Sequence, residues 1–121
     1  MTEILIVDDN PINLKLTKLL LAKEGYRVLT AGSAEEALQS LENTRPRLIL
    51  MDLQLPGMSG LELTAQLKAD PAFQDLVIVA VTAYAMKGDE EKALASGCDG
   101  YISKPLDVQT FASQVAGYLK E

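Results

Sequence analysis

Three aspartates stand directly after apolar runs of the chain, which makes them the first candidates for chemistry. Asp8 and Asp9 follow the run 4–7, and Asp52 follows the run 48–51. Carboxylates that gather in one place repel one another unless a cation joins them. Because the chain has no histidine and a single cysteine, the ligands on offer are oxygen atoms, which suit Mg²⁺ or, as an alternative, Mn²⁺. A carboxylate beside such a cation can attack phosphorus, so the pattern predicts magnesium-assisted phosphoryl transfer to an aspartate.

A hydroxyl and an ammonium group follow two further apolar runs. Thr82 follows the run 76–81, and Lys104 comes shortly after 101–102. These groups could stabilise the oxygens of a transferring phosphoryl group. Taken alone, each polar residue has an ordinary explanation: the aspartates can cap a helix or start a turn, Thr82 can be a plain strand residue, and Lys104 a surface charge. Four runs would have to end in polar groups by chance, so we favour a shared site.

The elements that must position these residues alternate along the chain. Five short apolar runs are typical of buried parallel strands, and five segments with capping signals are typical of helices. The predicted strands are 4–7, 28–29 (as an edge strand), 48–51, 76–81 and 101–102, and the predicted helices are 11–24, 33–42, 59–69 or 60–69, 88–96 and one after Asp107. This order predicts an α/β fold, a doubly wound parallel sheet spanning 1–121 as one domain. In such sheets the site lies at the carboxyl ends of the strands.

Composition excludes several classes of function. The 121 residues hold 11 Lys+Arg against 17 Asp+Glu, a net charge of -6, which argues against direct binding of nucleic acid. One cysteine allows no intramolecular disulfide, and we expect Cys98 to be a small buried hydrophobe. The chain shows no signal peptide and no apolar stretch approaching the ~20 residues of a membrane span. We therefore expect a cytoplasmic protein without membrane insertion.

Two helices carry apolar residues whose faces can be predicted from a 100° turn per residue. In the first helix, Ile12, Leu16, Leu19 and Leu20 form a broad face that we expect to be core. Leu14 and Leu21 lie nearly opposite, with Thr17 between them; they either pack against the last helix or form an apolar docking stripe for a helical-bundle phosphodonor. In the last helix, the predicted core face consists of Val108, Phe111, Ala112, Val115 and Leu119.

Four motifs together resemble one known family. They are Ile6-Val7-Asp8-Asp9-Asn10, the stretch from Met51-Asp52 through Gln54 and Pro56-Gly57 to Gly60, Thr82-Ala83, and Lys104-Pro105. The sequence resembles the receiver domains of two-component response regulators (the CheY-like superfamily), with closer similarity to single-domain DivK-type regulators and to the receivers of hybrid kinases. The resemblance implies a flavodoxin-like (βα)5 sheet with strand order 2-1-3-4-5.

The same resemblance implies a role for each matching residue. Asp52 would accept a phosphoryl group from a histidine kinase or a histidine phosphotransfer protein. The other implied roles are Mg²⁺ ligands (Asp8, Asp9, Asp52 and the carbonyl of Gln54), phosphoryl contacts (Thr82, Ala83 and Lys104), a conformational switch (Thr82 and Tyr101) and a surface that reports phosphorylation (Tyr84 and Met86). The output would be a contact with a downstream protein, made by a monomer or by a phosphorylation-dependent dimer.

Three other interpretations remain open at this point. A haloacid-dehalogenase-like phosphatase would need a second aspartate at the position of Gln54. A flavodoxin-like electron carrier would need a hydroxyl- and glycine-rich loop after the first strand, where this chain has Asp8-Asp9-Asn10-Pro11. A receiver serving only as a scaffold is disfavoured because all five site residues are present. Within the receiver interpretation, the non-acidic Gln54 and the bulky Tyr84 predict slow self-dephosphorylation.

Overall fold

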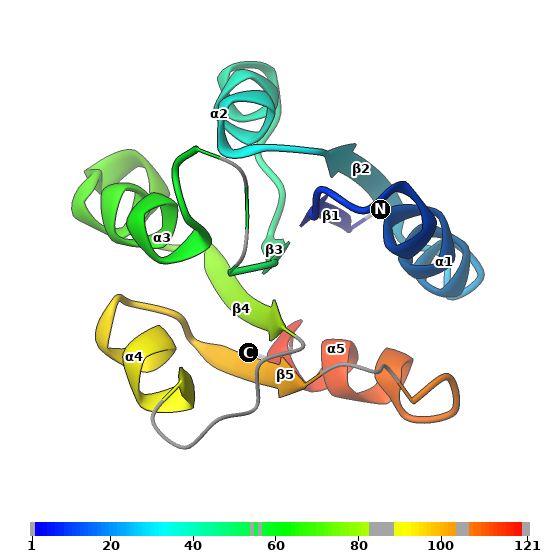
Figure 1. Ribbon diagram of the computed structural model, residues 1–121. Helices are drawn as coiled ribbons and strands as arrows, with labels where there is room; N and C mark the ends of the chain where they lie inside the picture. The colour runs from blue at the N-terminus through cyan, green and yellow to red at the C-terminus, as the bar shows by residue number, and fades with distance from the viewer. Residues whose placement is uncertain (1, 54, 56, 83–88, 104–106, 120–121) are drawn as a thin grey trace.

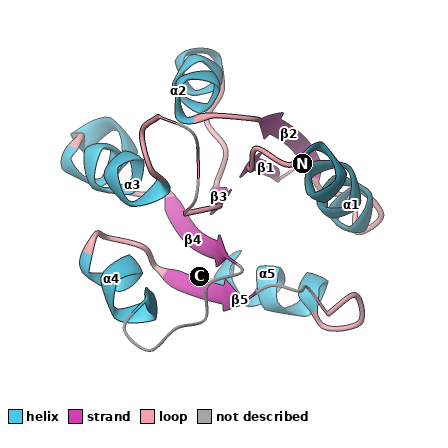
Figure 2. Ribbon diagram, viewed as in Figure 1, coloured by secondary structure: helices cyan, strands magenta, loops and turns pink. Residues whose placement is uncertain are grey.

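The computed structural model describes residues 2–53, 55, 57–82, 89–103 and 107–119. Five parallel strands form one sheet in the order β2-β1-β3-β4-β5, and helices alternate with them along the chain (Figures 1 and 2). The strands are β1 (Glu3–Val7), β2 (Arg27–Ala31), β3 (Leu48–Met51), β4 (Val77–Thr82) and β5 (Gly100–Ser103). The helices are α1 (Pro11–Ala22), α2 (Ala34–Asn43), α3 (Gly60–Ala69), α4 (Asp89–Ala95) and α5 (Phe111–Leu119), with a 3₁₀ turn η1 (Pro71–Phe73). The predicted flavodoxin-like fold and its strand order are confirmed.

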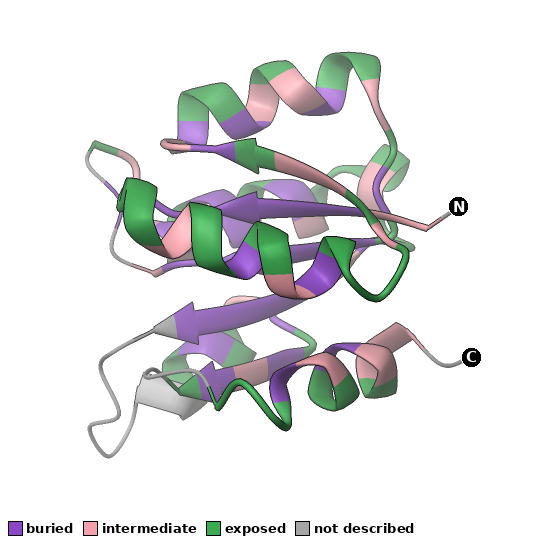
Figure 3. Cartoon of the chain, turned by 90° about the vertical axis from the view of Figure 1, so that its right-hand side faces the viewer, coloured by how far each residue is buried: buried purple, intermediate pink, exposed green. Residues whose placement is uncertain are grey.

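Side chains of the central strands alternate between two cores, as the period of a strand requires. Leu5, Ile49 and Ile78 belong to a first core, which α2, α3 and α4 cover. Their neighbours Ile4, Leu48 and Val79 belong to a second core, which α1 and α5 cover. Among the described side chains of the central strands, β3 is buried throughout, and β1 and β4 are buried except at their first residues, Glu3 and Val77 (Figure 3). This explains why they are continuous apolar runs in the sequence.

Side-chain caps begin three of the helices at the predicted places. Asn10 accepts hydrogen bonds from the N–H groups of Ile12 and Asn13, Ser33 from that of Glu36, and Ser59 from that of Glu62. The first helix ends two residues earlier than predicted, at Ala22. The chain turns there because Gly25 takes a φ of 90°, a conformation that favours glycine.

The predicted core face of α1 is wrong for three of its four residues. For Leu14 and Leu21 the first alternative, packing in the core that the last helix covers, is confirmed, and these two leucines do not form an exposed docking stripe. Leu21 is fully buried and Leu14 packs against the second core, whereas three residues of the expected core face are exposed: Ile12 by 77%, Leu19 by 61% and Leu16 by 42%. Leu20 does pack against the core as expected. Thr17 misled the prediction: its hydroxyl donates to the carbonyl of Asn13 at 2.7 Å, so this polar residue is buried with its hydrogen bond satisfied inside the helix.

The predicted face of the last helix needs one correction. Phe111 and Val115 are buried, but Val108 is 59% exposed. Asp107 makes a turn in which its carboxylate accepts from the N–H of Gln109 and its carbonyl from that of Phe111. The helix therefore starts only at Phe111, and Val108 lies in the turn rather than on the helical face. Within the described parts of the chain, no helix is both long and apolar enough to cross a membrane.

Candidate functional site

Asp8, Asp9 and Asp52 meet at the carboxyl edge of the sheet. β1 and β3 are neighbours with Val7 opposite Met51, so Asp8 and Asp52 each follow one residue of a matched pair. The N–H of Asp52 donates to the carbonyl of Val7 at 2.9 Å, which extends the pairing into the site. One carboxylate oxygen from each of the three aspartates lies within 4.8 Å of the other two. The predicted convergence of the three side chains is confirmed.

The local sequence fixes the first two aspartates. The Asp8 carboxylate accepts a hydrogen bond from the N–H of Asn10 at 2.9 Å, and Asn10 in turn caps α1. Asp8 is buried and Asp9 is exposed. The turn therefore places one carboxylate inside and one at the surface, directly before the first turn of α1.

Two glycines shape the loop that follows Asp52, a role that sequence reasoning missed. A Cβ atom built on Gly60 would overlap the main-chain carbonyl of Asp52 and lie 2.8 Å from the Cα of Leu53. The N–H of Gly60 also donates to the carbonyl of Leu53 at 3.2 Å. α3 thus begins in contact with the main chain of the central aspartate, which only a residue without a side chain allows. The turn itself uses Gly57 at a φ of 74°.

The three carboxylates fit a hard divalent cation. Asp8 and Asp52 are 5% and 8% exposed, and Asp9 opens the cluster to solvent. Close carboxylates repel one another, and a cation ligated by oxygen offsets that repulsion. An all-oxygen donor set with one open side suits Mg²⁺, which keeps several waters and takes phosphate oxygens as further ligands.

The remaining predicted site residues are placed in part. Thr82 is the last residue of β4 and pairs with Ser103 of β5, so its main chain lies at the same edge as the aspartates. Tyr101 is half-buried in β5, opposite Ala80, and packs against the first core. Gln54, Ala83, Tyr84, Met86 and Lys104 lie outside the described residues, so their roles and the slow dephosphorylation stay predictions.

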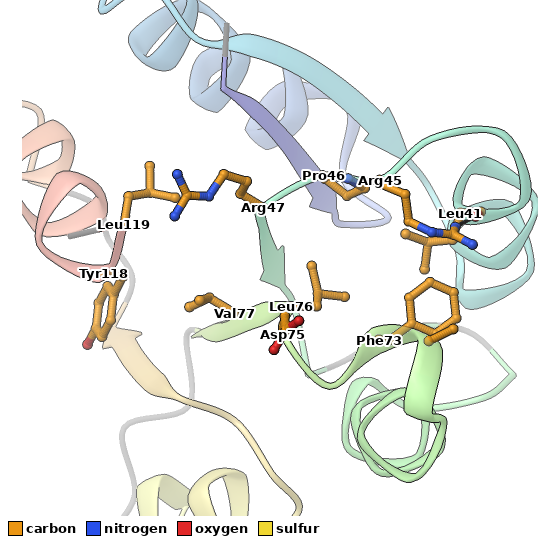
Figure 4. Close-up of a pocket in the computed structure, with 11 residues that line it drawn as sticks. Leu41, Arg45, Pro46, Arg47, Phe73, Asp75, Leu76, Val77, Tyr118 and Leu119 are labelled. Carbon is orange, nitrogen blue, oxygen red and sulfur yellow. Dashed lines mark hydrogen bonds between the residues drawn. The ribbon is translucent and has the colours of Figure 1, made fainter. Parts of the chain in front are cut away.

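The opposite, amino-terminal edge of the sheet has different chemistry. A cavity of about 540 Å³ lies there between the end of α2 and the last turn of α5 (Figure 4). Arg45 and Arg47 line its walls. The Arg45 guanidinium lies over the Phe73 ring at 4.9 Å and donates to the carbonyl of Thr44 at 3.1 Å. Arg47 extends toward Leu119. The cavity is lined by residues that lead into β3 and β4 and by the last turn of α5, and it is therefore separate from the three aspartates.

Acidic and basic groups are paired on that amino-terminal side. The Asp99 carboxylate accepts from the Lys68 ammonium at 2.9 Å and from the Ile78 N–H at 2.8 Å, and Lys68 also donates to the carbonyl of Leu76 at 2.7 Å. The neighbouring Cys98 is buried as expected, and desolvation raises its pKa above the ordinary value of 9.0. We assign these contacts to holding α3, β4 and β5 together.

Comparison with known proteins agrees with this geometry. The family model for the response regulator receiver domain matches residues 4–116. The polar-differentiation response regulator DivK of Brucella anthropi is 46% identical over 116 residues, covering 96% of this chain and 94% of that protein.

Solved structures give the same result. The receiver domain of a sensor histidine kinase from Pseudomonas aeruginosa, which has a magnesium ion coordinated in its active site cleft, is 33% identical with a TM-score of 0.88 and covers 98% of this chain and 97% of its own. The receiver domain of a signal transduction histidine kinase from Syntrophus aciditrophicus is 33% identical with a TM-score of 0.90, covering 98% and 90% of the two chains. The chain belongs to the response regulator receiver family, the phosphoacceptor signalling proteins of two-component systems, whose partners include histidine kinases.

Proposed function

We propose that Asp52 is the phosphoacceptor and that the protein signals through the conformational change that follows. The observation that carries this proposal is the buried position of Asp52 at the end of a central strand, with carboxylates of Asp8 and Asp9 within 4.8 Å. A carboxylate oxygen of Asp52 attacks the phosphorus of a phosphohistidine. The new O–P bond forms as the N–P bond breaks, and the imidazole keeps that electron pair and takes up a proton from solvent.

The chain's own residues arrange this transfer. The β1–β3 pairing holds the Asp52 main chain, and the turn through Asn10 holds Asp8. Asp8, Asp9 and Asp52 would hold Mg²⁺, with the Gln54 carbonyl as a further ligand, and the bound cation would neutralise charge on the phosphoryl oxygens. Thr82, the Ala83 amide and Lys104 complete the proposed phosphoryl contacts.

Phosphorylation of Asp52 would act as a population shift. A phosphoryl group that binds Thr82 better in one conformer favours that conformer. In the proposed switch, Thr82 moves toward the phosphoryl group and the Tyr101 ring turns inward. Tyr101 is suited to this role because it is half-buried on the edge strand next to β4.

Intact-mass measurement tests the phosphoacceptor assignment. The protein is incubated with Mg²⁺ and acetyl phosphate, alongside Asp52→Asn and Asp75→Asn. We expect one added phosphoryl group on the wild type and on Asp75→Asn, whose exposed carboxylate lies at the amino-terminal edge, and none on Asp52→Asn or with a chelator present. Addition to Asp52→Asn would overturn the assignment.

The exposed side of α1 is the proposed contact for the phosphodonor. Ile12, Leu16 and Leu19 are exposed beside Lys15 and Lys18, and α1 contains no acidic residue although the whole chain is acidic. Asn10 caps this helix next to Asp9, so the stripe starts at the phosphorylation site. An apolar stripe flanked by lysines suits a helical bundle that carries the phosphohistidine on an apolar and acidic face.

Three serine substitutions test this surface. Ile12→Ser, Leu16→Ser and Leu19→Ser together should lower transfer from the cognate kinase about tenfold or more, because apolar anchors dominate such contacts. Phosphorylation by acetyl phosphate, which needs no docking, should stay unchanged. Leu94→Ser, which replaces an exposed leucine of α4, is the matched control. Unchanged transfer in the triple variant would contradict the proposed surface.

A further inference from the structure

Two tyrosines lie on opposite faces of β5. Successive residues of a strand point to opposite sides, and Tyr101 packs against the first core whereas Ile102 belongs to the second. Gly100 therefore faces the second core, where Tyr118 of α5 packs. Tyr118 therefore packs against β5 on the face opposite to the Tyr101 ring.

The Tyr118 ring rests directly on the main chain of β5. A Cβ atom on Gly100 would overlap the ring and the hydroxyl of Tyr118, so the ring occupies the space that any side chain at this position would fill. The Tyr118 hydroxyl also accepts a hydrogen bond from the N–H of Tyr101 at 3.4 Å. β5 is the last strand of the sheet, and N–H groups at a sheet edge need partners other than a neighbouring strand.

We propose that Tyr118 is a positioning residue for the Tyr101 switch. Its hydroxyl holds the Tyr101 N–H, next to the Cα–Cβ bond about which the Tyr101 ring turns, and its ring packs on the preceding glycine from the other face. The α5 side of the sheet thereby influences the equilibrium of a ring on the α4 side. This inference rests on the proposed function, because it assumes that the Tyr101 ring responds to the phosphorylation site.

Fluorine NMR on protein labelled with 3-fluorotyrosine measures this influence. The Tyr101 signal is assigned with Tyr101→Phe and followed with and without Mg²⁺ and beryllofluoride in wild type, Tyr118→Phe and Tyr26→Phe. Tyr118→Phe keeps the ring and removes only the hydroxyl, and Tyr26 is a half-buried tyrosine on the same core. We expect the ratio of Tyr101 ring populations to change about two- to tenfold in Tyr118→Phe, the range of one hydrogen bond, and to stay at the wild-type value in Tyr26→Phe.

Amide hydrogen exchange separates the hydrogen bond from the switch. The Tyr101 N–H should exchange about two- to tenfold faster in Tyr118→Phe than in wild type. Equal exchange in both proteins would overturn the proposed bond, and faster exchange with unchanged ring populations would overturn its link to the switch. If the Tyr101 fluorine signal of the wild type does not change when beryllofluoride is added, the proposed switch is overturned and this inference with it. Faster exchange in that case would show that the bond itself exists.

Discussion

The two edges of the sheet use acidic side chains in opposite ways. At the amino-terminal side, Asp99 is paired with the Lys68 ammonium and the Ile78 N–H. At the carboxyl edge, Asp8, Asp9 and Asp52 lie together within 4.8 Å, two of them buried. Like charges that share a small space cost stability unless a cation joins them. The first arrangement holds the fold together, whereas the second is suited to binding a cation and a phosphoryl group.

Backbone packing follows the same division. Gly60 brings the start of α3 into contact with the main chain of Asp52, which fixes the central carboxylate. At the other side, Gly97 turns the chain at a φ of 113° before the Cys98–Asp99 segment. If this comparison is right, substitutions at the carboxyl edge should impair chemistry, and those at the amino-terminal edge should lower stability alone.

Gly60→Ala should have the largest effect. The new methyl group would overlap the Asp52 carbonyl, so the loop must shift and carry the carboxylate with it. We expect phosphorylation by acetyl phosphate to slow at least tenfold and the free energy of unfolding to fall by about 1–3 kcal/mol, measured by intact mass and urea denaturation.

Gly117→Ala is the matched control, because a Cβ atom on this glycine of α5 meets nothing within 4 Å. It should raise the free energy of unfolding by about 0.5–1 kcal/mol and leave the phosphorylation rate unchanged. Equal phosphorylation rates in the two variants would show that Gly60 does not position the site.

Lys68→Met should have an intermediate effect, confined to stability. The substitution removes the ammonium group that contacts Asp99 and the Leu76 carbonyl. The loss should be about 1–2 kcal/mol in urea denaturation, since both partners keep some access to water. Lys15→Met, at an exposed lysine of α1, should cost almost nothing. A reduced phosphorylation rate in a fully folded Lys68→Met protein would contradict the expectation that substitutions at the amino-terminal edge affect stability alone.

Cys98→Ala should have the smallest effect, a change in the pH dependence of the free energy of unfolding that is visible only at alkaline pH. Burial raises the pKa of this thiol in the folded protein above 9.0, so the unfolded chain ionises first as the pH rises. The stabilising contribution is complete below the ordinary pKa and is lost as the pH passes through the raised value. The free energy of unfolding should therefore fall more steeply above pH 9 in the wild type than in Cys98→Ala. Parallel slopes would contradict this assignment.

Sequence patterns predicted the central part of the molecule well. Apolar runs bounded by polar residues gave β3 without error and placed Asp8, Asp9 and Asp52 together, because parallel strands share an edge for their carboxyl ends. Helix starts followed from Asn10, Ser33 and Ser59, whose side chains cap the helices as their types suggest.

The failures arise where three-dimensional packing decides the outcome. α1 carries leucines on both sides, and the buried Thr17 made its core face look polar. The strand β2 extends over Arg27–Ala31, longer than its apolar part, because an edge strand tolerates the exposed Arg27 and Thr30. The close approaches at Gly60 and Gly100 depend on residues distant in sequence or on another element. The positions of Gly60 and Gly100 in the sequence do not indicate these contacts.

The position of the phosphoryl group on the chain decides whether Asp52 is the phosphoacceptor. The protein phosphorylated with acetyl phosphate and Mg²⁺ is reduced with borohydride, which converts an aspartyl phosphate to homoserine, and is then digested and mapped by mass spectrometry. We expect homoserine at position 52 alone, while Asp99 stays intact. Homoserine at position 8 or 9, or modification spread over exposed carboxylates such as Asp75, would contradict it.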